Sequence, residues 1–123
     1  MRRRRWGIWG EPAVSWVPLS KDELLGLITS AQERMTPDQR CLWGAIRIPP
    51  EKWAQHPYGE LGGGFWAVGL LGRTVVWYND IEEGFNCSEY TVYGTIGPYL
   101  CNQDGLEVAI RSLLARTKVS IGG

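Results

Sequence analysis

Apolar residues recur at helical spacing in the segment SKDELLGLITSAQERMT, residues 20–36. Leu24, Ile28, Ala31 and Met35 repeat at this spacing, with Leu27 beside them. Positions three and four apart form one stripe on a helix, so this pattern predicts an amphipathic helix. Ser20 followed by Glu23 is the pattern of a capping box at the start of the helix, and Thr36-Pro37 ends it.

The same spacing returns near the C-terminus. The apolar residues that repeat at this spacing there are Leu106, Ala109, Ile110, Leu113 and Leu114. Asn102 or Asp104 can cap the start of this helix, and Arg111 and Arg116 suit its C-terminal half, where positive charge is favourable. The pattern therefore predicts one helix toward each end of the chain.

Between these helices, the segment FWAVGLLGRTVVWYN (residues 65–79) is apolar at almost every position except around Gly72-Arg73. Glycine tolerates the positive φ that a two-residue hairpin turn requires. Two apolar arms around such a turn predict a β-hairpin, and their continuous apolar character predicts strands that are covered on both faces.

Four further segments have weaker patterns. CLWGAIRI (41–48) is predicted as a strand that two prolines stop, PEKW (50–53) as one helical turn, and GEPAVSWVPLS (10–20) as a short first strand. In SEYTVYGTI (88–96) polar residues alternate with apolar ones, which predicts a strand with one polar and one buried face.

This order of elements predicts the α+β class. We expect a single domain over residues 1–123, in which an N-terminal and a C-terminal helix pack on an antiparallel sheet of four or five strands. Residues 1–10, with four consecutive arginines at 2–5, are expected to form a flexible basic N-terminus. One arginine run without interleaved aromatics is a weak nucleic-acid footprint, so no nucleic-acid partner is predicted.

Composition refines this picture. The chain is 44% hydrophobic and has seven tryptophans, which excludes a disordered protein and places most of the tryptophans in a core. Exposed tryptophans would instead point to a homodimer. Three cysteines without a CxxC pair indicate reduced thiols rather than a disulfide framework or a structural zinc site, and no cofactor is predicted. No signal peptide and no run of 18 apolar residues is present, which predicts a cytoplasmic protein without a membrane partner.

Charge is distributed unevenly along a chain whose net charge is zero. Residues 74–110 contain no lysine or arginine and carry six acids: Asp80, Glu82, Glu83, Glu89, Asp104 and Glu107. We expect a window of this charge to have a function, with its carboxylates outward and close together.

Catalysis and metal binding have weak support in the sequence. His56, the single histidine, lies in a loop, and neither Cys87 nor Cys101 lies in a nucleophile motif, although a Cys–His dyad remains open. The segment NDIEEGFN (79–86) is rich in oxygen donors, but its spacing is not that of an EF-hand loop, and no metal site is predicted.

Recognition of a basic protein partner is the interpretation that the acidic window favours, because carboxylates pair with Lys and Arg and aromatics supply desolvated anchors. The predicted partner-binding residues are Asp80, Glu82, Glu83, Asn86, Glu89, Tyr90 and Tyr93. The competing interpretation is structural: Asp80 and Asn86 would cap turns, Trp77 and Phe85 would fill the core, and the glutamates would keep the protein soluble.

The runs WYNDIEEGFNCSEY and YGTIGPYLCNQDGLEVAI resemble small bacterial immunity proteins of polymorphic toxin systems, over about half of the chain from Phe65 to Leu114. The resemblance implies a cytoplasmic, non-catalytic protein that binds and blocks a cognate toxin, many of which are cationic nucleases. The arginine-rich start and the neutral net charge depart from a strongly acidic inhibitor.

An alternative from another class is a small enzyme or ligand-binding domain. Its pocket would lie near His56 and the Gly62–Gly64 loop, with a carboxylate such as Glu60 or Glu83 converging on it.

Overall fold

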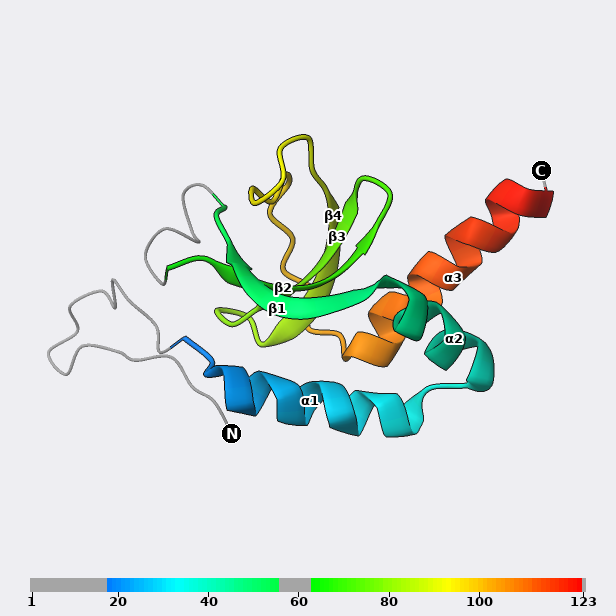
Figure 1. Ribbon diagram of the computed structural model, residues 1–123, viewed down its shortest axis with the longest axis horizontal. Helices are drawn as coiled ribbons and strands as arrows, with labels where there is room; N and C mark the ends of the chain where they lie inside the picture. The colour runs from blue at the N-terminus through cyan, green and yellow to red at the C-terminus, as the bar shows by residue number, and fades with distance from the viewer. Residues whose placement is uncertain (1–17, 56–62, 123) are drawn as a thin grey trace, which may run out of the picture.

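The computed structural model describes residues 18–55 and 63–122, with side chains described up to residue 117 (Figure 1). The elements are α1 (Lys21–Arg34), α2 (Pro37–Ile46), β1 (Arg47–Trp53), β2 (Phe65–Leu71), β3 (Thr74–Asn79), β4 (Gly84–Glu89) and α3 (Leu106–Gly122). The strands form one antiparallel sheet in the order β1-β2-β3-β4. The α+β class is therefore confirmed, and the sheet has four strands in the described part of the chain.

Helix α1 confirms the first predicted helix, including its capping box. The Ser20 hydroxyl accepts a hydrogen bond from the Glu23 amide at 3.1 Å, and the Glu23 carboxylate accepts one from the Ser20 amide at 3.0 Å. Leu24, Ile28 and Ala31 are buried along one face. Helix α3 confirms the second predicted helix, and it begins at Leu106.

Helix α2 corrects the prediction of a strand over residues 41–48 for residues 41–46, whereas Arg47 and Ile48 are in strand β1. The signal in the sequence is a second capping box, in which Thr36 and Gln39 exchange hydrogen bonds of 3.0 and 3.2 Å between side chain and backbone amide. Pro37 lies in the first helical turn, where its missing N–H is not needed. The proline that ends α1 thus also starts α2.

Strand β1 corrects the prediction of a helical turn at PEKW, residues 50–53. The strand lies at one edge of the sheet, and its register with β2 shifts between Arg47 and Glu51, where the two prolines lie. Prolines are tolerated at a sheet edge and at bulges because they have no N–H to donate to the ladder.

The hairpin of β2 and β3 is confirmed, with its turn at Gly72-Arg73 and Gly72 at φ +59°. These strands occupy the centre of the sheet, as their apolar pattern predicted. The strand predicted over 88–96 is correct only for Ser88 and Glu89, because β4 ends at Glu89. The predicted strand at 10–20 lies almost wholly outside the described residues.

Each face of the sheet is covered by a different part of the chain. On one face, all three helices pack in a core with Val68, Val76, Tyr78 and Phe85 of the sheet. On the other face, Ile96, Tyr90 and Tyr99 pack over a second core. The strand residues of that second core are Trp53, Phe65, Ala67, Val75 and Trp77. We call residues 90–105 the covering segment; in Figure 1 it runs from β4 to α3.

Of the four tryptophans that the structure describes, Trp43, Trp53 and Trp77 are buried and Trp66 is half-buried. This agrees with the expectation that most tryptophans are core residues. Within the described residues, no helix combines the length and apolar character that a membrane span requires.

Candidate functional site

The seven predicted partner-binding residues do not form one surface. Two of them are buried, two lie in the turn between β3 and β4, and three follow one another at and beyond the far end of β4. A six-residue strand separates the two exposed groups by about 17 Å along its axis.

Asp80 and Asn86 are inside the fold, which corrects the prediction that they contact a partner. Asp80 is 1% exposed, and its carboxylate accepts a hydrogen bond of 3.0 Å from the Leu19 amide just before α1. Asn86 is 2% exposed and bonds through its side-chain amide to both backbone groups of Asn102. Both residues connect the sheet to other parts of the chain, which is closer to the structural interpretation of the sequence.

Glu82 and Glu83 lie in the β3–β4 turn, which Asn79 organises. The buried Asn79 side chain accepts hydrogen bonds from the amides of Ile81 and Glu82 and donates to the Leu100 carbonyl at 2.9 Å. Glu83 is exposed and has φ +62°. The sequence interpretation overlooked Asn79, although asparagine at the start of a turn is a recognised signal.

The expectation that the carboxylates of the acidic window lie outward and close together is met only in part, because Glu83 and Glu89 are exposed but lie at opposite ends of β4. Besides the buried Asp80, Glu107 forms a salt bridge of 2.9 Å with Arg34 of α1. The hydrogen bond from this guanidinium is the main reason that the pKa of Glu107 lies below its ordinary value. The neutralising charge comes from a residue 73 positions away in the sequence, so a window along the chain could not reveal it.

The most exposed apolar side chains of the described residues follow Glu89 and Tyr90 in the chain. Val92 and Tyr93 are 62% and 61% exposed, well above any other large hydrophobic side chain there. They lie in a tight turn in which the Thr95 amide donates to the Val92 carbonyl at 3.0 Å. We call Val92 and Tyr93 the display tip.

The display tip is fixed to the sheet by its own backbone. The Ala54 amide donates to the Gly94 carbonyl at 2.9 Å, and the Ile96 amide donates to the Ala54 carbonyl at 2.8 Å. Gly94 has φ +95°, a conformation that glycine adopts without strain. These backbone hydrogen bonds therefore hold the turn in one conformation.

Beneath the tip, aromatic side chains surround one carboxylate. The Trp53 ring lies 5.0 Å from the ring of Tyr90 and 4.8 Å from that of Tyr93, measured between centroids. The Glu51 carboxylate accepts hydrogen bonds from the Trp53 indole N–H at 2.8 Å and from the Tyr93 hydroxyl. The sequence interpretation missed Glu51 and Trp53, because β1 was not recognised as a strand.

The hydrogen bond between Tyr93 and Glu51 changes the pKa of both groups. It lowers the pKa of Glu51, with a second contribution from the Trp53 N–H, and it raises the pKa of Tyr93. A carboxyl group whose pKa is depressed by folding stabilises the fold above its unfolded value of 4.5, and this contribution disappears as pH falls through the folded pKa. A phenol whose pKa is raised contributes below 10.0 and loses its effect as pH rises through the folded pKa.

A pH prediction follows. Tyr93→Phe should lower the melting temperature at neutral pH, and the difference from the parent protein should disappear in acid, once Glu51 is protonated in both proteins. Thermal unfolding of the two proteins across pH measures this effect. A difference that stays constant down to pH values well below 4.5 would show that the phenol does not act through the carboxylate.

Nucleophilic chemistry has little support among the described residues. Burial raises the pKa of the Cys87 thiol to about 11, so the reactive thiolate is scarce at neutral pH. Cys41 and Cys101 are exposed. His56, Glu60 and Gly62 lie outside the described residues, as do the arginines at 2–5. No group of three His, Cys, Asp or Glu side chains placed to hold a metal ion occurs in residues 18–55 and 63–117.

Comparison of this chain with protein-family models, with curated proteins and with solved structures finds no match.

Proposed function

We propose that this protein is a non-catalytic binding module of the immunity type, which acts in the cytoplasm and neutralises a cognate bacterial toxin. The observation that carries the proposal is the display tip, where an aliphatic and an aromatic side chain project from a turn that the sheet holds in place. The resemblance of the chain to immunity proteins supplies the class of partner.

The chemistry of the tip suits a protein partner. Tyrosine is enriched among the residues that dominate binding energy, because it offers a large contact area at little cost in conformational entropy. The backbone hydrogen bonds of the turn reduce that cost further, since the conformation is already formed in the free protein. The Glu51 carboxylate contacts Tyr93, and the exposed Glu89 ends β4 just before residues 90–105. These two acids favour a partner surface that carries Lys or Arg.

The proposal requires a toxin domain encoded by a neighbouring gene, and the decisive experiment uses that domain. Cells that express the toxin domain should survive when the parent protein is co-expressed. We expect the double variant V92S/Y93A to lose protection and to bind the purified toxin domain at least 100-fold more weakly, because it removes both exposed anchors. Circular dichroism should still show the folded spectrum at room temperature, although Y93A also removes the hydrogen bond to Glu51 and lowers the melting temperature.

A matched control is Leu25→Ser on α1, which removes an exposed leucine from another part of the molecule. It should leave protection and affinity unchanged. Equal affinity of V92S/Y93A and the parent protein would exclude the display tip. If no toxin domain binds, and light scattering shows a dimer that V92S/Y93A converts to a monomer, the tip is a homodimer contact and the immunity assignment is wrong.

Charge reversal distinguishes Glu89, at the end of β4, from the glutamates of the β3–β4 turn. Glu89→Lys should slow association and weaken binding about 10-fold at low salt, because it places a cation beside the partner's basic groups. Glu83→Lys, at the opposite end of β4, should have little effect. The reverse order would move the contact surface to the β3–β4 turn.

A further inference from the structure

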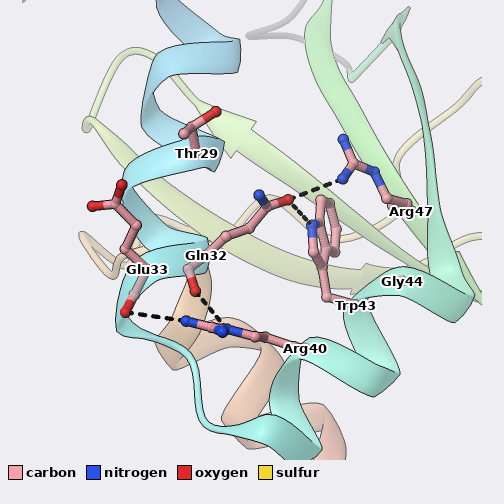
Figure 2. A pocket seen from close by; sticks show the side chains of 7 residues that line it. All are labelled: Thr29, Gln32, Glu33, Arg40, Trp43, Gly44 and Arg47. Carbon is pink, nitrogen blue, oxygen red and sulfur yellow. Dashed lines mark hydrogen bonds between the residues drawn. The ribbon is translucent and has the colours of Figure 1, made fainter.

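A polar cleft lies between α1 and α2, on the helical side of the molecule (Figure 2). Its volume is about 380 Å³, within the range of small-ligand sites. Helix α1 contributes Thr29, Gln32 and Glu33, and α2 contributes Arg40, Trp43 and Gly44, with Arg47 at its end. Both sets follow helical spacing, so two helix faces form the walls.

Gln32 is held in one orientation at the centre of the cleft. Its side-chain oxygen accepts hydrogen bonds from the Trp43 indole N–H at 2.8 Å and from the Arg47 guanidinium at 2.9 Å. Indole and guanidinium groups can only donate, so the oxygen must face them and the amide nitrogen must lie on the other side, as Figure 2 shows. This nitrogen has no hydrogen-bond partner among the described residues, so its two donors are available to a ligand.

Arg40 and Arg47 are also held in place, and each has N–H groups that make no hydrogen bond within the described residues. The Arg47 guanidinium lies over the Trp43 ring, 5.3 Å from its centroid, and uses one terminal nitrogen for Gln32. Arg40 covers the C-terminal carbonyl groups of α1, donating to Gln32 at 3.0 Å and to Glu33 at 3.5 Å. One terminal nitrogen of each arginine makes no hydrogen bond within the part of the chain described here.

The acid of the cleft does not compete for these donors. In Figure 2 the carboxylate of Glu33 turns away from Gln32 and Arg47, and only its backbone carbonyl meets Arg40. The cleft therefore presents two guanidinium groups, one oriented amide and the hydroxyl of Thr29.

We propose that this cleft binds a phosphate group of a small ligand. Thr29 and Gln32 lie on one wall of the cleft and Arg40 and Arg47 on the other. Donors on two walls suit a tetrahedral oxyanion better than a planar carboxylate held by one arginine edge. A phosphate carries a charge of about −1.5 to −2 at neutral pH, which the two guanidinium groups match. The site is open to solvent, so binding of inorganic phosphate should be weak, in the millimolar range.

Titration with sodium phosphate, followed by NMR at the Trp43 indole N–H, tests the proposal. We expect a saturable shift in the parent protein, with sodium chloride at equal ionic strength giving none. Arg47→Gln should weaken phosphate binding at least 10-fold, while Arg73→Gln, an exposed arginine at the β2–β3 turn, should bind as the parent does. Arg47→Lys should be intermediate, because it keeps the charge and loses the fixed geometry.

Three results would overturn the proposal: a shift that does not saturate, equal binding by Arg47→Gln and the parent, or tighter binding of acetate than of phosphate. Unfolding curves of each variant check that the fold is intact. If Arg47→Gln fails to fold, Thr29→Val provides the second test, because it removes one donor from an exposed position on the α1 wall of the cleft and should reduce phosphate affinity by a few-fold. Unchanged affinity in Thr29→Val would then count against the site.

Discussion

Gly97→Ala is expected to detach the covering segment from the sheet and to lower the free energy of unfolding by about 3 kcal/mol. A β-carbon on Gly97 would lie 2.2 Å from the backbone oxygen of Glu89, which is far inside van der Waals contact. The atom in the way is backbone, so no side-chain rotation can relieve the overlap. The hydrogen bond that the Gly97 amide donates to this oxygen, at 3.0 Å, would be lost with it.

Chemical denaturation measures the loss of stability, and hydrogen exchange measures the detachment of the covering segment. The amides of Thr95, Ile96 and Gly97 should exchange faster in the variant, because their hydrogen bonds hold the segment below the display tip. Partner binding should fall together with this protection if the proposed function holds. Gly26→Ala is the matched control: its β-carbon meets nothing within 4 Å in α1, so the variant should be slightly more stable. Unchanged exchange in Gly97→Ala would show that the close approach is not needed.

Asn86→Ala is expected to lower the free energy of unfolding by a similar amount, about 3 kcal/mol, and the melting temperature by about 10 °C. Its side chain accepts from the Asn102 amide at 3.0 Å and donates to the Asn102 carbonyl at 3.2 Å. An alanine would leave both backbone groups unpaired and open a space in a buried position. Thermal unfolding measures the loss.

Asn102→Ala is the matched control, because it also replaces an asparagine but keeps both hydrogen bonds. Residue 102 is exposed and takes part through its backbone, so the variant keeps both hydrogen bonds and should be within about 0.5 kcal/mol of the parent. A loss as large as that of Asn86→Ala would mean that the Asn102 side chain has a role that these contacts do not explain.

Two hydrogen-bonded contacts, of Asp80 with Leu19 and of Asn86 with Asn102, explain why the acidic window did not predict the exposed surface correctly. In the sequence, Asp80 and Asn86 belong to a polar run that looks like a surface loop. In the fold, Asn86 lies in β4 with the covering segment against it, and Asp80 receives the amide of Leu19 from 61 positions away. A buried polar residue with a distant partner cannot be told from an exposed one by composition alone.

The sequence predicts only part of the surroundings of the display tip, for a related reason. Tyr90 and Tyr93 are among the predicted partner-binding residues, but Glu51 and Trp53 belong to the part of β1 that the sequence predicts as a helical turn. The alternation of residues 88–96 predicted a strand, whereas the Gly94 turn directs the chain across the sheet. Local periodicity is short there, and long-range hydrogen bonds to Ala54 decide the conformation.

The sequence by itself determined the α+β class, the α1 and α3 helices and the β2–β3 hairpin. Each of these depends on interactions between residues close in the chain: a capping box, an apolar stripe and a glycine turn. Only the tertiary structure decided which acids are buried, which one pairs with Arg34, and that Tyr93 meets Glu51. Burial and charge pairing depend on residues that folding brings together. For that reason the sequence alone could not predict which of these side chains form the exposed surface.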